Sequence, residues 1–386
     1  MTDTPIRILL LGTHGQHNIG DELLLETFLA QLGSDHSYVI NTYDLADTTA
    51  RLGARYTYEL IDTARDRVAL LGHLRRADVL VFAGGSIVKE LSRATGRGRY
   101  ATLLMILALV VAARWFGAKP VAMLNIGVGP IQTARGRRLA RRILDRADLV
   151  TVRDAASRRL CDDIGTSTTV VASTDAVFAT TPAWLRGDEV ATPREASGPL
   201  RVALSLNHDI AVPENWNHVI ETVGAALRTV GHERALEIHA LPMQSRGKTH
   251  HDAAVLDEFA ARNPGLTVIP HRPTTHQDVA RIVASCDLVL GERLHALITA
   301  AKLGVPVLPL VYDVKVGELA EAFGVSHLAV DLGVPFTAKD LVDAITEVAD
   351  EPAVARRALG ERVADLTDRA RVGFDGARAW IREQAR

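Results

Sequence analysis

Short apolar runs alternate with longer helical patterns along most of the chain. In the first half, runs rich in Val, Ile and Leu are separated by stretches with helical periodicity, such as Glu22–Leu32 and Arg135–Asp145. Near-continuous apolar strands separated by helices predict a parallel sheet that is covered on both faces. The strands expected in this half are 6–12, 38–43, 78–85, 120–129, 149–153 and 169–174.

The alternation breaks at residues 181–199, which contain three prolines and two glycines and are typical of a linker. It resumes afterwards, so we expect a first domain at 1–180 and a second at 200–350. The charged helical tail at 351–386 is expected to pack across the junction. The strands expected in the second domain are 201–207, 235–241, 266–270, 287–291 and 305–313.

The predicted fold class is therefore α/β, with two doubly wound domains facing each other across a cleft. A length of 386 residues suits two domains. Ligands bind such sheets outside the carboxyl ends of the strands, so we expect the site in the cleft.

The composition bears on the kind of partner and on the cellular compartment of the protein. The formal net charge of −2 gives no reason to expect a nucleic-acid partner. Two cysteines, far apart in the sequence, suit a reducing compartment and indicate neither a disulfide framework nor a zinc site. The first residues run almost directly into an apolar strand, without the basic segment of a signal peptide, so we expect a cytoplasmic location.

Two segments bear on membrane contact. Residues 100–113 carry no charge, but a spanning helix needs about 20 apolar residues. This stretch is therefore either a buried core helix or part of a groove for a lipid tail. The helix at 135–146 carries Arg135, Arg138, Arg142 and Arg146 at helical spacing, which is either a solvated face or a surface for anionic lipid. The second alternative predicts peripheral contact with the cytoplasmic face of a membrane.

A glycine-bearing turn follows the first strand and leads into a helix. Such a turn can direct backbone N–H groups at an anion, but its spacing is not that of the dinucleotide fingerprint. Asp21 is either a cap or a first-turn acid of this helix, or it binds sugar hydroxyls together with Asn18.

Two further glycine turns end the third and fourth strands, at 83–86 and 127–130. Tight turns need glycine in any case, but small residues also let a ligand approach the backbone closely. Gly84, Gly85 and Gly129 are therefore candidates for contacts with a ligand or with the opposite domain.

Arg153 ends an apolar strand, at the sheet edge where ligands bind. It either pairs with Asp154 or Asp175, or its guanidinium binds a carboxylate or phosphate with two parallel hydrogen bonds.

The strongest chemical signal follows strand 287–291. Arg293 and His295 combine anion affinity with a titratable proton carrier, and Lys315 reaches the same sheet edge one strand later. We expect these three side chains to converge on a small polyanion. Other histidines, His239, His250 and His251, lack the spacing of a known metal site, so no metal is expected.

These motifs together resemble the polysaccharide pyruvyl transferase family, and the resemblance covers nearly the whole chain in order. The matching segments are N-x-G-D-E at 18–22, the glycine cluster at 83–86, G-x-G-P at 127–130, V-R-D-x-x-S at 152–157, D-x-V-F at 175–178, R-L-H-A-L-I at 293–298 and Y-D-x-K at 312–315.

The resemblance implies two Rossmann-like domains of the GT-B kind, with the acceptor side in the first and the donor side in the second. It implies transfer of a pyruvyl group from phosphoenolpyruvate onto two hydroxyls of a glycan or lipid-linked sugar, with release of phosphate and without a cofactor. It assigns donor binding and catalysis to Arg153, His295 and Lys315, to which position alone adds Arg293. An oligomer is compatible with all of these expectations.

Two departures from the family pattern affect the expected site. Ala83 or Ser86 replaces one glycine of the usual triplet, and Asn207 stands where a basic residue is frequent. Two rival functions remain. One is a glycosyltransferase that uses a nucleotide sugar, and the other is a non-catalytic glycan-binding relative.

Overall fold

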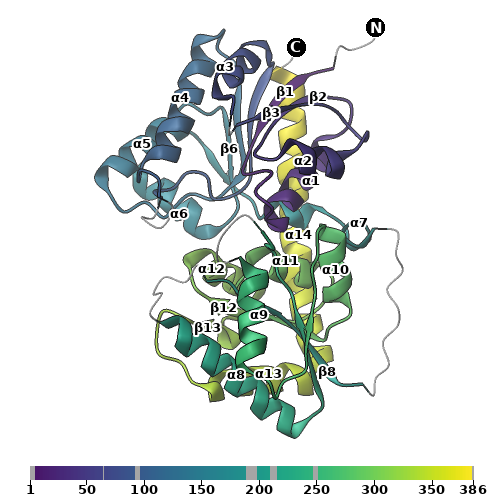
Figure 1. Cartoon of the computed structure of the whole chain (residues 1–386). Helices are drawn as coiled ribbons and strands as arrows, with labels where there is room; N and C mark the ends of the chain where they lie inside the picture. Colours follow the sequence, from purple (N-terminus) through teal and green to yellow (C-terminus); the bar gives the residue numbers. More distant parts are fainter. Residues whose placement is uncertain are drawn as a thin grey trace. The chain divides into compact units, whose positions relative to one another are not determined.

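The computed structural model describes residues 5–63, 65–91, 96–187, 198–208, 215–246 and 251–384. These residues form two compact units, each built on a parallel sheet (Figure 1). The first unit contains residues up to 16, 21–179 and the end of the chain from Leu366, and the second contains His17–Gly20 and Thr180–Asp365. The α/β fold class is confirmed.

The first sheet has seven strands in the order β3-β2-β1-β4-β5-β6-β7, all parallel. Its strands are β1 (Arg7–Leu11), β2 (Ser37–Thr42), β3 (Thr57–Asp62), β4 (Val79–Ala83), β5 (Val121–Ile126), β6 (Leu149–Val152) and β7 (Val170–Ala172). Six of these were expected, and β3 was not.

Six helices of this unit connect the strands: α1 (Ile19–Leu32), α2 (Leu45–Leu52), α3 (Arg67–Arg76), α4 (Ala101–Trp115), α5 (Ala134–Leu144) and α6 (Ala155–Ile164). Helices α3 to α6 form one layer in which each contacts the next (Figure 1). The buried side chains between this layer and the sheet form one apolar cluster, to which α4 contributes Leu103, Ile106, Val110 and Ala113.

The second sheet has six parallel strands in the order β10-β9-β8-β11-β12-β13. Its strands are β8 (Leu200–Ser205), β9 (Leu236–Ala240), β10 (Val268–Pro270), β11 (Leu288–Gly291), β12 (Val307–Val311) and β13 (Val330–Asp331). The two-residue strand β13 was not expected. The expected linker begins with a short helix, α7 (Pro182–Arg186), and its residues 188–197 lie outside the described part of the chain.

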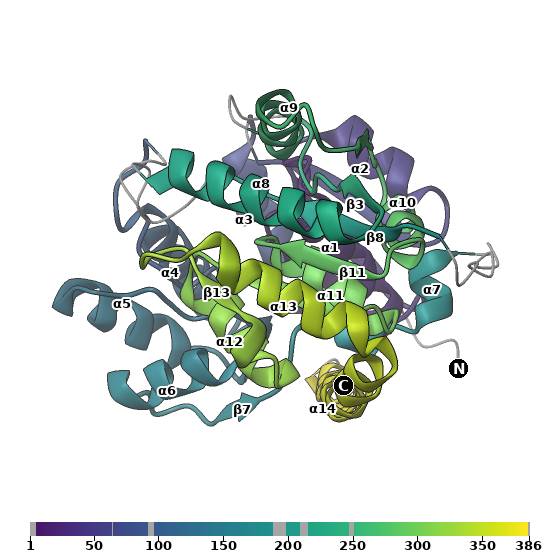
Figure 2. The same ribbon diagram turned by 90° about the horizontal axis from the view of Figure 1, so that it is seen from below.

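The helices of the second unit are α8 (Trp216–Glu233), α9 (Asp252–Arg262), α10 (His276–Ala284), α11 (Leu294–Lys302), α12 (Val314–Phe323) and α13 (Ala338–Asp350). Helices α8 and α13 lie side by side and, with α9, bury the main apolar cluster of this unit (Figure 2).

The chain ends in the long helix α14 (Pro352–Gln384), whose residues are divided between the two units. In the first unit it packs on α1, where the rings of Phe28 and Phe374 meet edge to face at 5.3 Å. Among the described residues, no helix combines the length and apolar character needed to cross a membrane.

Candidate functional site

Five charged or titratable residues lie at the carboxyl ends of two neighbouring strands of the second sheet, and the sequence had singled out three of them, Arg293, His295 and Lys315. Glu292, Arg293 and His295 follow β11, and Asp313 and Lys315 follow the neighbouring strand β12. The parallel arrangement places both turns at the same sheet edge, as the sequence predicted.

Lys315 lies in the first turn of α12, two residues after its N-cap Asp313. Its Nζ lies 2.9 Å from an Oδ2 of Asp313 and 5.1 Å from the centre of the Tyr312 ring. Burial disfavours the charged ammonium, but Tyr312 and Asp313 outweigh it and raise the pKa of Lys315. Lys315 is therefore a fixed positive charge at neutral pH.

Arg293 also acts on Tyr312, the residue beside Lys315. Burial raises the pKa of Tyr312, and the positive charges of Lys315 and Arg293 oppose that rise. Arg293 is thus within electrostatic reach of the Tyr312 hydroxyl, which supports the expected convergence of the two turns. The guanidinium also has a structural partner: its Nε donates to Asp252 Oδ2 at 2.8 Å, and its Nη2 donates to the other carboxylate oxygen.

Asp252 is a buried hub that the sequence did not reveal. Its Oδ2 also accepts from the backbone N–H groups of Met243 and Gln244, at 3.0 and 3.1 Å. The carboxylate is fully buried, so this one side chain fixes both Arg293 and the loop after β9. His251 beside it caps α9 with its ring nitrogen. His250 lies outside the described residues.

His295 lies in the first turn of α11 against residues of the N-terminal turn that belong to the same unit. A Cβ on Gly20 would lie 2.3 Å from its Nδ1, so only glycine leaves room for the imidazole there. The turn is held in place because Ile19 N–H donates to Met243 O at 2.9 Å, and Asn18 pairs with Gln244. Asn18 itself accepts the Gly20 N–H through its side chain at 3.1 Å.

Asn207 and Glu292 form a buried pair at the ends of the adjacent strands β8 and β11. The Asn207 amide donates to Glu292 Oε2 at 3.0 Å, and both residues are almost fully buried. The residue that departs from the family pattern therefore interacts with an internal carboxylate, which sequence reasoning did not select.

Arg153 lies in the first unit, at the end of β6, and its side chain is 6% exposed. Its Nη2 donates to Ser86 Oγ at 2.8 Å, and its Nε donates to Asp154 at 3.2 Å. Asp175 is also within ion-pair distance at 3.9 Å. The guanidinium lies over the backbone of Gly127, where a Cβ would approach it to 3.1 Å. Arg153 therefore has both of the ion-pair partners that the sequence suggested, Asp154 and Asp175. An anion that bound to this guanidinium would share it with these two carboxylates.

The three glycines that were candidates for ligand contacts in the first unit are also required by the backbone conformation. Gly84, Gly85 and Gly129 have φ values of +63°, +72° and +110°, which L-residues with side chains rarely adopt. A Cβ on Gly84 would approach the Phe28 ring, and one on Gly129 would approach Leu160. These contacts explain two of the three glycines by packing.

The helix that follows the N-terminal turn begins with two acids, Asp21 and Glu22, in its first turn. Glu22 is 1% exposed and its Oε1 accepts the Gly15 N–H at 2.7 Å. Burial raises the pKa of Glu22 to about 7 and lowers the pKa of the neighbouring His14 to about 4. Both groups are thus neutral near pH 6, which the sequence alone did not indicate.

We expect Glu22 to make the first unit less stable as the pH rises. Its pKa is 4.5 when unfolded and about 7 when folded, so between these values the folded chain holds a proton that the unfolded chain releases. Stability should fall over this window by up to about 3 kcal/mol. Glu22→Gln should remove the fall, so its melting temperature should exceed that of the wild type at pH 8 more than at pH 5. Asp163→Asn, at an exposed carboxylate of the same unit, should show no such pH-dependent gain.

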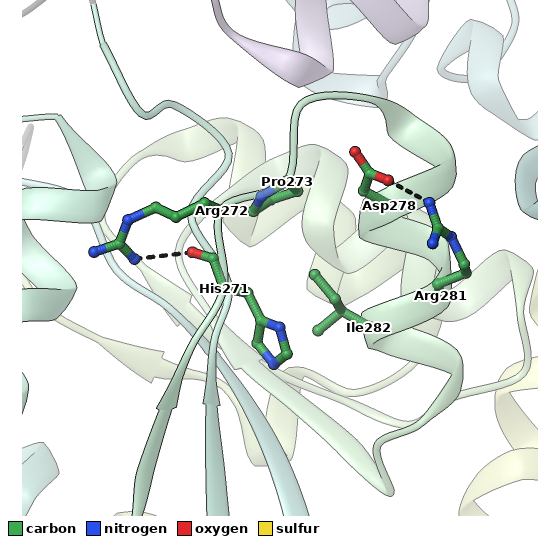
Figure 3. Close-up of a pocket in the computed structure, with 6 residues that line it drawn as sticks. All are labelled: His271, Arg272, Pro273, Asp278, Arg281 and Ile282. Carbon is green, nitrogen blue, oxygen red and sulfur yellow. Dashed lines mark hydrogen bonds and ion pairs between the residues drawn. The ribbon is translucent and has the colours of Figure 1, made fainter.

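A hollow of about 280 Å³ lies at the other end of the same sheet edge, lined by His271, Arg272, Pro273, Asp278, Arg281 and Ile282 (Figure 3). Its two arginines form ion pairs, Arg281 with Asp278 and Arg272 with Asp257. His271 stacks on His239, and their ring nitrogens lie 3.0 Å apart. None of the residues predicted for the donor lines this hollow. The described part of the chain holds no cluster of three or more His, Cys, Asp or Glu side chains arranged for a metal ion.

The sequence was compared with protein-family models and with curated protein sequences. A family model described as polysaccharide pyruvyl transferase matches residues 18–314, so Lys315 lies one residue beyond the matched range. No curated protein sequence matches the chain.

Solved structures share the fold at low identity. A glycosyltransferase from Rickettsia africae has a TM-score of 0.64 at 10% identity, covering 99% of both chains. A putative UDP-N-acetylglucosamine 2-epimerase from Listeria monocytogenes has a TM-score of 0.60 at 13% identity, and the match covers 93% of this chain and 91% of the other. A UDP-GlcNAc 2-epimerase from Neisseria meningitidis, solved with bound UDP-GlcNAc, has a TM-score of 0.57 at 11% identity, and the match covers 95% of this chain and 98% of the other. The expected GT-B architecture is confirmed.

Proposed function

Since this chain belongs to the polysaccharide pyruvyl transferase family of glycan-modifying transferases, we propose that it transfers a pyruvyl group from phosphoenolpyruvate to a sugar. The observation that carries the proposal is the cationic group at the carboxyl ends of β11 and β12. There, Lys315 keeps its charge and lies in the turn next to that of Arg293 and His295. A donor with both a carboxylate and a phosphate suits several cations on one sheet edge.

In the proposed reaction, a proton adds to the methylene carbon of phosphoenolpyruvate and one sugar hydroxyl adds to C2. The C2–O bond to phosphate then breaks as a second hydroxyl closes the ketal. Of the two hydroxyl protons, one replaces the proton taken up by the methylene carbon and the other leaves with the phosphate. Lys315 would hold the donor's anionic groups and stabilise the departing phosphate. His295 would carry protons between hydroxyl and carbon near neutral pH.

In this proposal, Arg293 helps to bind the donor mainly through its positive charge, which is held at a fixed position. Two of its five N–H groups bind Asp252, and the guanidinium therefore supplies a fixed positive field beside Tyr312 and Lys315. Asn18, Asp21 and the glycine turns stay candidates for the acceptor, and Arg153 for the donor.

Donor binding tests the proposal directly. Phosphoenolpyruvate should raise the melting temperature of the full chain, since a ligand stabilises the state that binds it. Lys315→Met removes a charge-assisted contact of about 1.5–3 kcal/mol, so the donor Kd measured by calorimetry should rise by about 10- to 100-fold. Lys339→Met is the matched control, because that lysine is exposed and its ion pair with Asp343 lies within α13.

The role of Arg153 is tested in the same way. Arg153→Gln should weaken phosphoenolpyruvate binding if the arginine contacts the donor, whereas a purely structural role would lower the melting temperature and leave Kd unchanged. Unaltered donor binding in both the Lys315 and the Arg153 variants would contradict the proposed donor site. Tight binding of a nucleotide sugar in place of phosphoenolpyruvate would favour a glycosyltransferase.

A further inference from the structure

The outward face of α4 is apolar from end to end. Leu104, Ala108, Val111 and Trp115 follow each other at spacings of four, three and four residues, which places them on one stripe of the helix. All four are exposed, and Trp115 has 89% of its surface accessible. The opposite stripe packs into the core, so this helix is apolar on both its inner and its outer face.

A helix that covers a sheet normally turns charged or polar residues outward. Here no charged residue occurs between Ala101 and Ala113. The neighbouring helix α3 extends the apolar surface with Val68, 78% exposed, and Leu71, 43% exposed. Exposed apolar side chains that gather on two neighbouring helices are typical of a surface that binds a partner or a membrane.

Helix α5 borders this surface with positive charge. The two helices begin side by side, because Tyr100 Oη at the N-cap of α4 lies 3.0 Å from Thr133 Oγ1 at the N-cap of α5. At the other end of α4, Arg114 Nη2 donates at 2.7 Å to Asp148, which lies between α5 and β6. Residues 134–148 contain six arginines and two aspartates. The arginines are all exposed: Arg135, Arg137, Arg138, Arg141, Arg142 and Arg146. On the other side of α4, α3 ends in the exposed Arg75 and Arg76.

We propose that this face, the apolar stripes of α3 and α4 with the arginines of α5, docks on an anionic lipid bilayer. Apolar side chains beside a basic border are the composition of interfacial helices, in which each arginine near an anionic surface contributes about 1 kcal/mol. A second copy of the chain fits less well, because arginines border α4 on both sides, on α5 and at the end of α3, so that a two-fold contact would place positive borders opposite each other. The inference goes beyond the proposed function, since docking requires neither the donor nor turnover.

Vesicle binding of the full chain provides the test. Co-sedimentation with phosphatidylglycerol-containing vesicles at 0.1 M salt should exceed that with pure phosphatidylcholine vesicles at least tenfold. Raising the salt to 0.5 M should weaken binding, because the screening length falls below about 10 Å. Emission of Trp115 should shift to the blue on binding, and this shift should be lost in Trp115→Phe.

Two sets of variants separate charge from apolar contact. Replacing Arg137, Arg138 and Arg142 by Gln should lower binding by about 10- to 100-fold. The same change at the exposed Arg356, Arg357 and Arg371 of α14 removes equal charge and should have little effect. Leu104→Ser with Val111→Ser should also weaken binding, whereas Val354→Ser with Val372→Ser, at exposed valines of α14, should not.

The proposal is overturned if the chain fails to bind anionic vesicles at low salt, or if the α14 variants weaken binding as much as the α5 and α4 variants. It is also overturned if Leu104→Ser with Val111→Ser converts a dimer to a monomer, measured by light scattering, while vesicles bind no protein. Vesicle binding without any reaction of phosphoenolpyruvate would support the docking surface and contradict only the proposed function.

Discussion

His295→Gln is expected to lower kcat by about 10²–10⁴-fold while changing the Kd for phosphoenolpyruvate far less. The imidazole is the only proton carrier we assign to the reaction, and losing a general acid–base has this range of effect. Glutamine reaches the position of Nε2 and stays polar, but it does not exchange a proton near neutral pH. The measurement is kcat with a glycan acceptor together with a calorimetric donor Kd.

Two companion variants make the result specific. Gly20→Ala leaves the imidazole in the chain but forces it away, because the new Cβ would lie 2.3 Å from Nδ1. It should therefore reproduce part of the loss in kcat. His327→Gln, at an exposed histidine, should leave kcat unchanged. If His295→Gln keeps a near-normal kcat, the histidine is structural and another group carries the proton.

Asp252→Asn should destabilise the second unit by about 3–5 kcal/mol, the usual effect of breaking a buried ion pair from one side. The amide would leave the Arg293 charge without its carboxylate and would direct N–H groups toward the backbone N–H groups of Met243 and Gln244. For a unit of this size the melting temperature should fall by about 6–20 °C. Calorimetry of the full chain measures the change.

A control and a double variant identify the cause. Asp257→Asn lies on the same helix, but its partner Arg272 is exposed, so the loss should stay below about 1 kcal/mol. Adding Arg293→Met to Asp252→Asn should restore part of the stability, because it removes the stranded charge. A melting curve of Asp252→Asn that coincides with that of the wild type would contradict the role of Asp252 as a buried hub.

Periodicity predicted the strands that are buried on both faces, because these are almost continuously apolar. Strand β3 was missed for the same physical reason. It lies at a sheet edge, and Thr57 and Glu59 are exposed while Tyr58 and Leu60 are partly buried, so it alternates where the central strands do not. Strand β13 has two residues, too few for any pattern.

The candidate site was partly predictable because the carboxyl ends of parallel strands share one edge. That rule places the turns that carry Arg293, His295 and Lys315 at one sheet edge without knowledge of their side-chain contacts. It says nothing of Asp252, which lies 41 residues before Arg293 and reaches it only through the packing of α9. The pKa of Glu22 was equally hidden, because it depends on burial and not on residue type.

The most direct test of the account is turnover of phosphoenolpyruvate. The full chain should be incubated with phosphoenolpyruvate and a panel of lipid-linked, nucleotide-linked and unlinked sugars, with phosphate release and the ketal methyl signal measured together. The account predicts equal amounts of phosphate and sugar-bound pyruvate ketal with at least one acceptor, and neither product with His295→Gln at matched times. Consumption of a nucleotide sugar with glycosyl transfer, while phosphoenolpyruvate stays unchanged, would contradict it.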